Sequence, residues 1–151
     1  MKENLENLYE KAVMIAQEAH KGQMDKGGNP YIEHPLHVAS QVETLELKMI
    51  AVLHDTLEDS SLTAADLVEA GLPEEVVEAI VVLTHEDGNE EAYLDYIRRV
   101  AGNKLATRVK KEDLKHNMDM SRIQSPTEKD RKRCAKYEKA LRLLEELTAV
   151  E

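Results

Sequence analysis

Hydrophobic residues recur every three or four positions along most of this chain, and this spacing places them on one face of an α-helix. Runs that alternate strictly between apolar and polar residues, which indicate strands, do not occur. The fold class is therefore predicted to be all-α, a single helical bundle of about seven or eight helices without a sheet. The predicted helices cover residues 5–20, 35–42, 45–58, 63–71, 73–83, 90–100, 105–118 and 126–147.

Residues that typically begin or end helices lie between these predicted segments. The predicted loop at residues 22–30 holds three of the six glycines. Pro35 stands in the first turn of a predicted helix, where its missing N–H costs nothing. Thr63 and Asp66 resemble a capping box, which marks the beginning of another helix.

Composition favours one compact domain. The chain has 151 residues, of which 42% are hydrophobic and 33% are charged, as in globular proteins. We expect a single domain over residues 1–151, because this length suffices for one core. Aromatic residues make up only 3% of the chain, so the core must consist of Leu, Val, Ile, Ala and Met.

Charge and cysteine content narrow the range of partners. The net charge of −10 argues against nucleic acid as a partner, since its phosphates need a basic surface. No apolar run approaches the length that spans a membrane, so no membrane partner is expected. The single cysteine, Cys134, cannot form an internal disulfide and fits a reducing cytoplasm, where we expect the protein. Self-association into a homo-oligomer is left open.

One histidine and three carboxylates cluster in residues 54–59. On a continuous helix, Glu58 would lie above His54 and Asp59 above Asp55, because side chains four residues apart share a face. The adjacent His54 and Asp55 can offer a nitrogen and an oxygen to one divalent ion, and such mixed sets suit Mn, Fe or Zn. An isolated His-Asp pair is more often structural, but an apolar helix gains nothing by burying these charges unpaired. The segment therefore predicts a metal site.

Two further segments carry weaker signals. His34 stands where the loop passes into a helix. Asp113, His116 and Asn117 are spaced by three and four residues, so they face one way on a helix. Each segment taken alone would be interpreted as an ordinary polar turn or helix face.

Four segments, taken together and in order, resemble the HD superfamily, and within it the RelA/SpoT-like hydrolase domain of small stand-alone, metazoan-SpoT-homologue-like members. These segments are residues 19–23, 30–35, 54–59 and 113–118. The family is all-helical, and its hydrolase members use one Mn²⁺ to remove pyrophosphate from the 3′ position of guanosine tetra- and pentaphosphate. The resemblance implies Mn²⁺ as the cofactor and a small phosphorylated nucleotide as the substrate.

The resemblance also implies roles for individual residues. The implied metal ligands are His34, His54, Asp55 and Asp113. Glu58 and Asp59 match the catalytic acidic pair of the family, and Asn117 matches an asparagine that contacts the nucleotide. Further candidates for substrate binding are Lys21, Lys26 and Tyr31. The ligand set by itself also allows Fe, Zn, Co or Ni.

Three features bear on the substrate. Asp25 stands where the family carries an arginine that packs on the base, and Met120 stands where it carries a threonine. The basic residues 131–133 are predicted on the outer face of the last helix. The leading interpretation is a guanosine-3′,5′-bis(diphosphate) 3′-pyrophosphohydrolase. Two alternatives stay open: an HD-type nucleotidase or phosphatase for another nucleotide, and a non-catalytic, metal-dependent nucleotide-binding module.

Overall fold

The computed structural model describes residues 4–25, 27–85, 88–123 and 125–149. Within these ranges the chain forms nine α-helices, one 3₁₀ helix and an isolated β-bridge between Met24 and Pro30, with no strand. The predicted all-α class is confirmed. The elements are α1 (Leu5–Ala19), α2 (Glu33–Ser40), α3 (Leu45–Leu53), α4 (Thr56–Asp59), α5 (Ala64–Glu69), α6 (Glu74–Leu83), α7 (Glu90–Ala101), α8 (Lys104–Met118), η1 (Met120–Arg122) and α9 (Glu128–Thr148).

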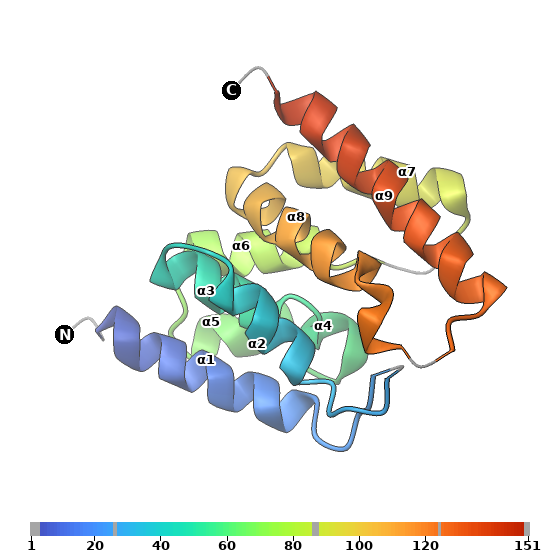
Figure 1. Cartoon of the computed structure of the whole chain (residues 1–151). Coiled ribbons are helices and arrows are strands. Elements are labelled where there is room, and N and C mark those ends of the chain that lie inside the picture. The colour runs from blue at the N-terminus through green and yellow to red at the C-terminus, as the bar shows by residue number, and fades with distance from the viewer. Residues whose placement is uncertain (1–3, 26, 86–87, 124, 150–151) are drawn as a thin grey trace.

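The helix α3 lies at the centre of the core, where it packs against α1, α2, α6 and α8 (Figure 1). Its buried residues are Leu47, Met49, Ile50, Ala51, Val52 and Leu53. As the composition predicts, the buried apolar side chains are Leu, Val, Ile, Ala and Met, joined by Tyr93 and Tyr96. Removal of this aliphatic surface from water is the main term that stabilises the fold.

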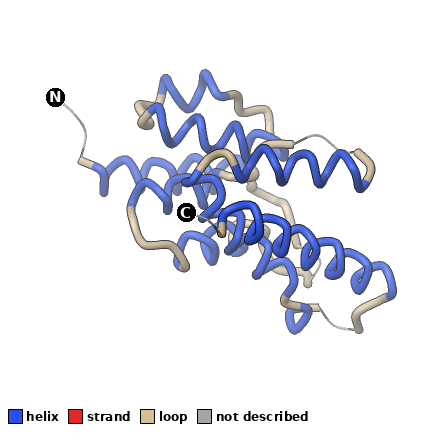
Figure 2. The backbone as a smooth tube through the Cα atoms, turned by 90° about the horizontal axis from the view of Figure 1, so that it is seen from above, coloured by secondary structure: helices blue, strands red, loops and turns tan. Residues whose placement is uncertain are grey.

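The helix α9 crosses the molecule on the side opposite α1 and packs on α7 and α8 (Figure 1). Short loops join most of the helices (Figure 2). The predicted capping box of Thr63 and Asp66 is confirmed at the beginning of α5, and a second one opens α9. In the part of the chain that the structure describes, no helix is long and apolar enough to cross a membrane.

The prediction of one continuous helix over residues 45–58 is wrong, because α3 ends at Leu53 and α4 begins at Thr56. Two side chains bind the carbonyl oxygens that the next helical turn would use. The His54 Nδ1 donates to the Ala51 carbonyl oxygen at 2.5 Å, and the Thr56 hydroxyl donates to the Leu53 carbonyl oxygen at 2.8 Å. Adjacent side chains on a continuous helix point about 100° apart. From the turn between the two helices both side chains nevertheless reach one point, where Asp55 Oδ2 lies 3.2 Å from His54 Nε2.

Candidate active site

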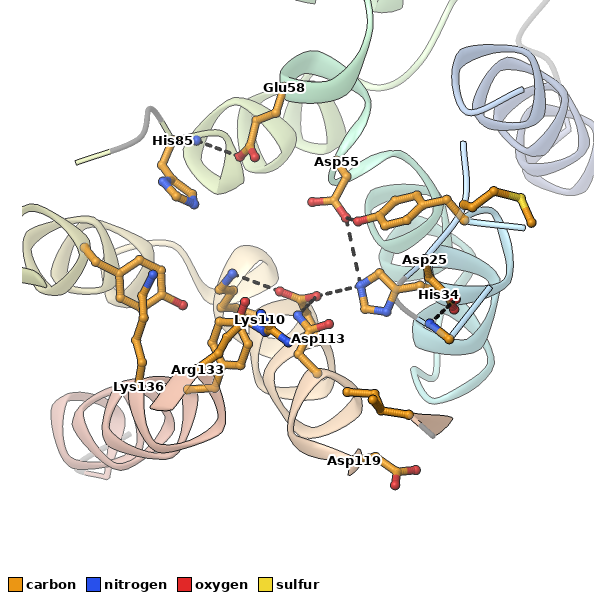
Figure 3. Close-up of a pocket in the computed structure, with 17 residues that line it drawn as sticks. Asp25, His34, Asp55, Glu58, His85, Lys110, Asp113, Asp119, Arg133 and Lys136 are labelled. Atoms are coloured by element: carbon orange, nitrogen blue, oxygen red, sulfur yellow. Dashed lines mark hydrogen bonds and ion pairs between the residues drawn. The ribbon is translucent and has the colours of Figure 1, made fainter. Parts of the chain in front are cut away.

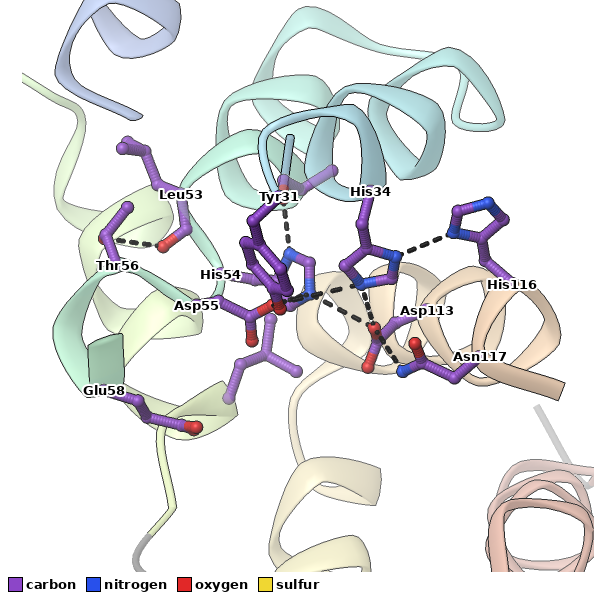
Figure 4. Close-up of polar contacts among 12 residues, drawn as sticks. Tyr31, His34, Leu53, His54, Asp55, Thr56, Glu58, Asp113, His116 and Asn117 are labelled. Carbon is purple, nitrogen blue, oxygen red and sulfur yellow. Dashed lines mark hydrogen bonds and ion pairs between the residues drawn. The ribbon is translucent and has the colours of Figure 1, made fainter. Parts of the chain in front are cut away.

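Two histidines and two aspartates from three parts of the chain meet at one point (Figure 4). His34 lies in α2 and Asp113 in α8, whereas His54 and Asp55 form the turn between α3 and α4. The Nε2 atoms of His34 and His54 lie 2.8 and 3.2 Å from Asp113 Oδ1. Asp55 Oδ2 lies 3.2 Å from His54 Nε2 and 3.9 Å from His34 Nε2. The structure thus brings the four predicted ligands together.

Three members of the cluster fit a single divalent ion. Among the described residues, His34, His54 and Asp113 each offer a donor atom, and these three atoms lie within 4.8 Å of one another. Asp55 adjoins this group through the Nε2 atoms of both histidines. Because the Ala51 carbonyl oxygen only accepts, His54 donates to it from Nδ1, and Nε2 is the ring nitrogen that faces Asp55 and Asp113. Two imidazoles with two carboxylates form a donor set that transition metals bind.

Asp113 is held as a carboxylate by its neighbours. Lys110 is 7% exposed, and its Nζ donates to Asp113 Oδ2 at 2.8 Å. Burial by itself would raise the pKa of Asp113, but the Lys110 ammonium and then His54 hold it well below its usual range. Asn117 Nδ2 donates to the other oxygen at 3.1 Å. Asp113 therefore carries its negative charge at neutral pH, as a metal ligand must.

Two further histidines, His116 and His37, form a row of contacts that begins at His34. The Nδ1 of His34 lies 2.7 Å from His116 Nδ1, so that one of the two rings donates to the other. The His116 ring in turn stacks on His37, with centroids 3.9 Å apart. A hydrogen bond on the second ring nitrogen of a ligating histidine fixes its orientation. The sequence placed His116 on the correct helix face, but its contact with α2 becomes visible only in the fold.

Tyr31 holds Asp55, the fourth predicted ligand. Its hydroxyl donates to Asp55 Oδ2 at 2.5 Å, as Figure 4 shows. Its ring packs against those of His20 and His34. Burial and the Asp55 charge raise the pKa of the Tyr31 hydroxyl, so it stays a donor at neutral pH. The sequence assigned Tyr31 to substrate binding through its ring. The hydroxyl supports the metal cluster instead, while base stacking stays a prediction.

If Asp55 is a metal ligand, replacing Tyr31 by Phe is expected to weaken the binding of a divalent metal about 10- to 100-fold, because partners of metal ligands have effects of this size. The ring and its packing remain, so the thermal midpoint of the metal-free protein should change little. Titration calorimetry with Mn²⁺ measures the affinity. Tyr9→Phe on α1 is the matched control. Wild-type affinity in Tyr31→Phe would show that the hydroxyl does not position Asp55.

The cluster of His34, His54, Asp55 and Asp113, called the metal cluster below, opens into a cavity of about 450 Å³ (Figure 3). This size is typical of small-molecule sites. Side chains of different chemistry face each other across it. Its lining includes Tyr31, His34, Asp55, Glu58, His85, Tyr93, Lys110, Asp113, Asn117, Arg133, Lys136 and Tyr137. The cavity therefore offers predicted metal ligands, the further carboxylates of Asp25, Glu58 and Asp119, and cations to a single ligand.

Glu58 lies on the cavity wall, but not where the sequence predicted it. Since the helix is broken before α4, Glu58 does not lie above His54. Its Oε1 instead accepts a hydrogen bond from the His85 backbone N–H at 2.8 Å (Figure 3). Loss of hydration raises the pKa of Glu58 to about 7, the His85 N–H opposes this, and the negative charge of Asp55 adds to it. A carboxyl with this pKa can exchange protons at neutral pH.

Asp59 ends α4 next to Glu58, but it is not among the described residues that line the cavity. Asp59 keeps its predicted place one helical turn after Asp55, because its N–H donates to the Asp55 carbonyl oxygen at 3.1 Å, although the two residues do not share one continuous helix. Burial and then the charge of Asp55 raise the pKa of its carboxyl. The structure therefore brings one member of the predicted acidic pair to the cavity wall and leaves the other beside it.

Two of the four residues predicted to bind substrate line the cavity. Asn117 and Tyr31 line the cavity. Lys21 is exposed and does not line it within the described part of the chain, because it belongs to the turn that ends α1. Lys26 lies outside the described residues. The Asp25 carboxylate lines the cavity and accepts from two N–H groups of its own loop, each at 2.9 Å.

The cavity residues on α9 were missed. The prediction that Arg133 lies on the outer face is wrong, because Arg133, Lys136 and Tyr137 all line the cavity (Figure 3). A signal was available, since these residues precede the buried Ala140 and Leu144 at helical spacing. The inward face of α9 is thus apolar at its end and cationic near the cavity.

Known proteins resemble this chain in sequence and in fold, although no protein-family model matches it. Over 117 residues, 70% of this chain, it is 33% identical to the guanosine-3′,5′-bis(diphosphate) 3′-pyrophosphohydrolase of Haemophilus influenzae. Over 127 residues, 74% of this chain, it is 32% identical to the GTP pyrophosphokinase of Myxococcus xanthus. The chain covers only 17% of the length of each of these relatives.

A solved structure matches nearly the whole fold. It is described as a metazoan ortholog of SpoT that hydrolyzes ppGpp and plays a role in starvation responses. The TM-score is 0.73 at 20% identity, over 93% of this chain and 91% of that one. The fold and the His-Asp cluster define an HD-type helical domain. By sequence the chain is RelA/SpoT-like, and this confirms the resemblance predicted from its motifs.

Proposed function

We propose that this chain is a metal-dependent pyrophosphohydrolase that removes the 3′-diphosphate from guanosine 3′,5′-bis(diphosphate). The observation that carries the proposal is the cavity itself. It joins a buried His-Asp cluster to a carboxyl with a pKa of about 7 and to cations on α9. The name of the Haemophilus influenzae relative supports the choice of reaction.

In the proposed reaction the metal cluster binds the ion, and a carboxyl of α4 transfers the proton. A divalent ion held by the four donors would lower the pKa of a water and polarise a phosphoryl oxygen. Glu58, as a carboxylate on the cavity wall, accepts the proton of the attacking water. Glu58 then returns this proton to the 3′ oxygen, which leaves when its bond to phosphorus breaks, while Asp59 lies beside it outside the cavity lining. The products are GDP and pyrophosphate.

The α9 side of the cavity supports a substrate that carries phosphate at two positions. Arg133 and Lys136 bring cationic side chains there, and Lys136 Nζ lies 4.2 Å from the centroid of the Tyr93 ring. The Tyr93 hydroxyl is buried and has no hydrogen-bond partner among the described residues. A second diphosphate would meet two charges and one free donor at this end.

Asp25 favours a second candidate, an HD-type nucleotidase for another nucleotide. It lines the cavity where the resemblance leads us to expect an arginine stacked on guanine. Its carboxylate organises the loop and cannot stack on a base as a guanidinium does. The identity of the base is therefore the part of the proposal that most needs measurement.

A hydrolysis panel tests the proposal. The purified chain is supplied with Mn²⁺ and incubated with guanosine 3′,5′-bis(diphosphate), mononucleotides and NADPH, and the products are identified by chromatography. We expect pyrophosphate and GDP from the first substrate, and no product from His54→Ala. Orthophosphate from mononucleotides would establish the nucleotidase instead. Binding without product would establish a non-catalytic module. Replacing Mn²⁺ by Zn²⁺ or Fe²⁺ tests the choice of metal.

A further inference from the structure

A buried imidazole beside the site has no part in the chemistry above. His20 is 2% exposed, and its Nε2 has no hydrogen-bond partner among the described residues. Burying a polar atom without a partner is unfavourable, so an apolar side chain would pack at this position at lower cost. The imidazole therefore needs a reason beyond packing.

The other ring nitrogen of His20 is connected to α4 through hydrogen bonds of Gln23. This nitrogen, Nδ1, lies 2.9 Å from Gln23 Oε1, and because this oxygen only accepts, Nδ1 is the donor. The Gln23 amide then donates from Nε2 to the Asp59 carbonyl oxygen at 3.0 Å and to the Ala19 carbonyl oxygen at 3.3 Å. A line of hydrogen bonds thus runs from His20 through Gln23 to the backbone of the acidic pair.

The same two residues also contact the metal side. The rings of His20 and Tyr31 pack with centroids 4.9 Å apart, and the Tyr31 N–H donates to the Gln23 carbonyl oxygen at 2.9 Å. Tyr31 in turn donates to the metal ligand Asp55 (Figure 4). His20 and Gln23 are therefore connected both to the metal cluster and to the turn that carries Glu58 and Asp59.

We propose that His20 and Gln23 are positioning residues that fix α4 relative to the metal cluster. The proposal rests on the proposed function, in which Glu58 of α4 acts on the substrate. A helix of four residues cannot hold its geometry by its own hydrogen bonds, so α4 depends on its neighbours. A misplacement of about 1 Å costs about 100-fold in rate. Loosening this turn should therefore lower kcat.

Side-chain replacements separate positioning from packing. His20→Leu and Gln23→Ala should each lower kcat about 10- to 100-fold, with KM and Mn²⁺ affinity little changed. His20→Asn keeps an amide donor near the place of Nδ1 and should restore most of the kcat lost in His20→Leu. The double variant should be no slower than the slower single variant, because both act through one line of contacts. Gln41→Ala, on the surface at the end of α2, should behave as wild type.

Backbone hydrogen exchange of residues 56–60, read by mass spectrometry without substrate, provides a measurement independent of turnover. His20→Leu and Gln23→Ala should exchange faster there than the wild type and Gln41→Ala. Wild-type kcat and wild-type exchange in both variants would overturn the positioning role while leaving the function intact. An inactive wild type with faster exchange in the variants would overturn the function and support the positioning role. If His20→Leu does not fold, His20→Asn and Gln23→Ala still decide the question.

Discussion

Glu58→Gln is expected to lower the turnover of guanosine 3′,5′-bis(diphosphate) about 100- to 10,000-fold while the protein keeps its metal. The magnitude is that of a lost general base. Glu58 lies on the cavity wall and hydrogen-bonds to the His85 N–H, outside the four-residue cluster, so the amide should leave Mn²⁺ affinity unchanged. Stopped assays of pyrophosphate release and metal analysis of dialysed protein measure the two effects. Glu10→Gln on α1 is the control.

The pH profile identifies the group that is lost. A general base must be ionised, and the pKa of Glu58 is raised to about 7. Below this value Glu58 is protonated, so kcat/KM of the wild type should rise with pH and level off above about pH 7. The residual activity of Glu58→Gln should lack this rise. The same rise in Glu58→Gln, or a rate that falls through neutral pH in the wild type, would contradict the assignment.

Asp113→Ala is expected to lose metal binding and also to lower the free energy of unfolding by about 3–5 kcal/mol. Asp113 is a predicted ligand and, in addition, the partner of the Lys110 ammonium at 2.8 Å. Both side chains are buried, so the replacement leaves a charge without compensation inside the protein. Urea unfolding in the presence of a chelator measures this effect separately from metal binding.

A double variant separates the two roles of Asp113. Lys110→Met combined with Asp113→Leu removes both charges and should recover most of the lost unfolding free energy, since apolar residues can replace a buried ion pair. It should still bind no Mn²⁺. If Asp113→Ala unfolds at the urea concentration of the wild type, or if it retains stoichiometric metal, the described role of Asp113 is wrong.

Local pattern predicted the helices well because the spacing of apolar residues depends only on neighbours along the chain. It failed where side chains competed with the backbone for hydrogen bonds. At His54 and Thr56 such competition ends α3 and changes where Glu58 lies, whereas Asp59 stays one helical turn after Asp55. The four ligand candidates did not depend on that continuous helix, since the ordered motifs had already marked them.

Contacts between distant segments needed the fold. The Tyr31 hydroxyl reaches Asp55 across 24 residues, and the Gln23 amide reaches Asp59 across 36. Nothing in either segment alone indicates these bonds. The same holds for Arg133 and Lys136, whose place on the cavity follows from how α9 packs on α7 and α8.

The sequence by itself determined that this protein is helical, and its motifs marked His34, His54, Asp55 and Asp113 as a metal set. Only the tertiary structure decided that these four meet, that Glu58 rather than Asp59 faces the cavity, and that α9 supplies its cations. The physical reason is distance along the chain. Periodicity is a property of neighbouring residues, whereas the pair of His34 and Asp113, 79 residues apart, forms only when α2 and α8 pack together.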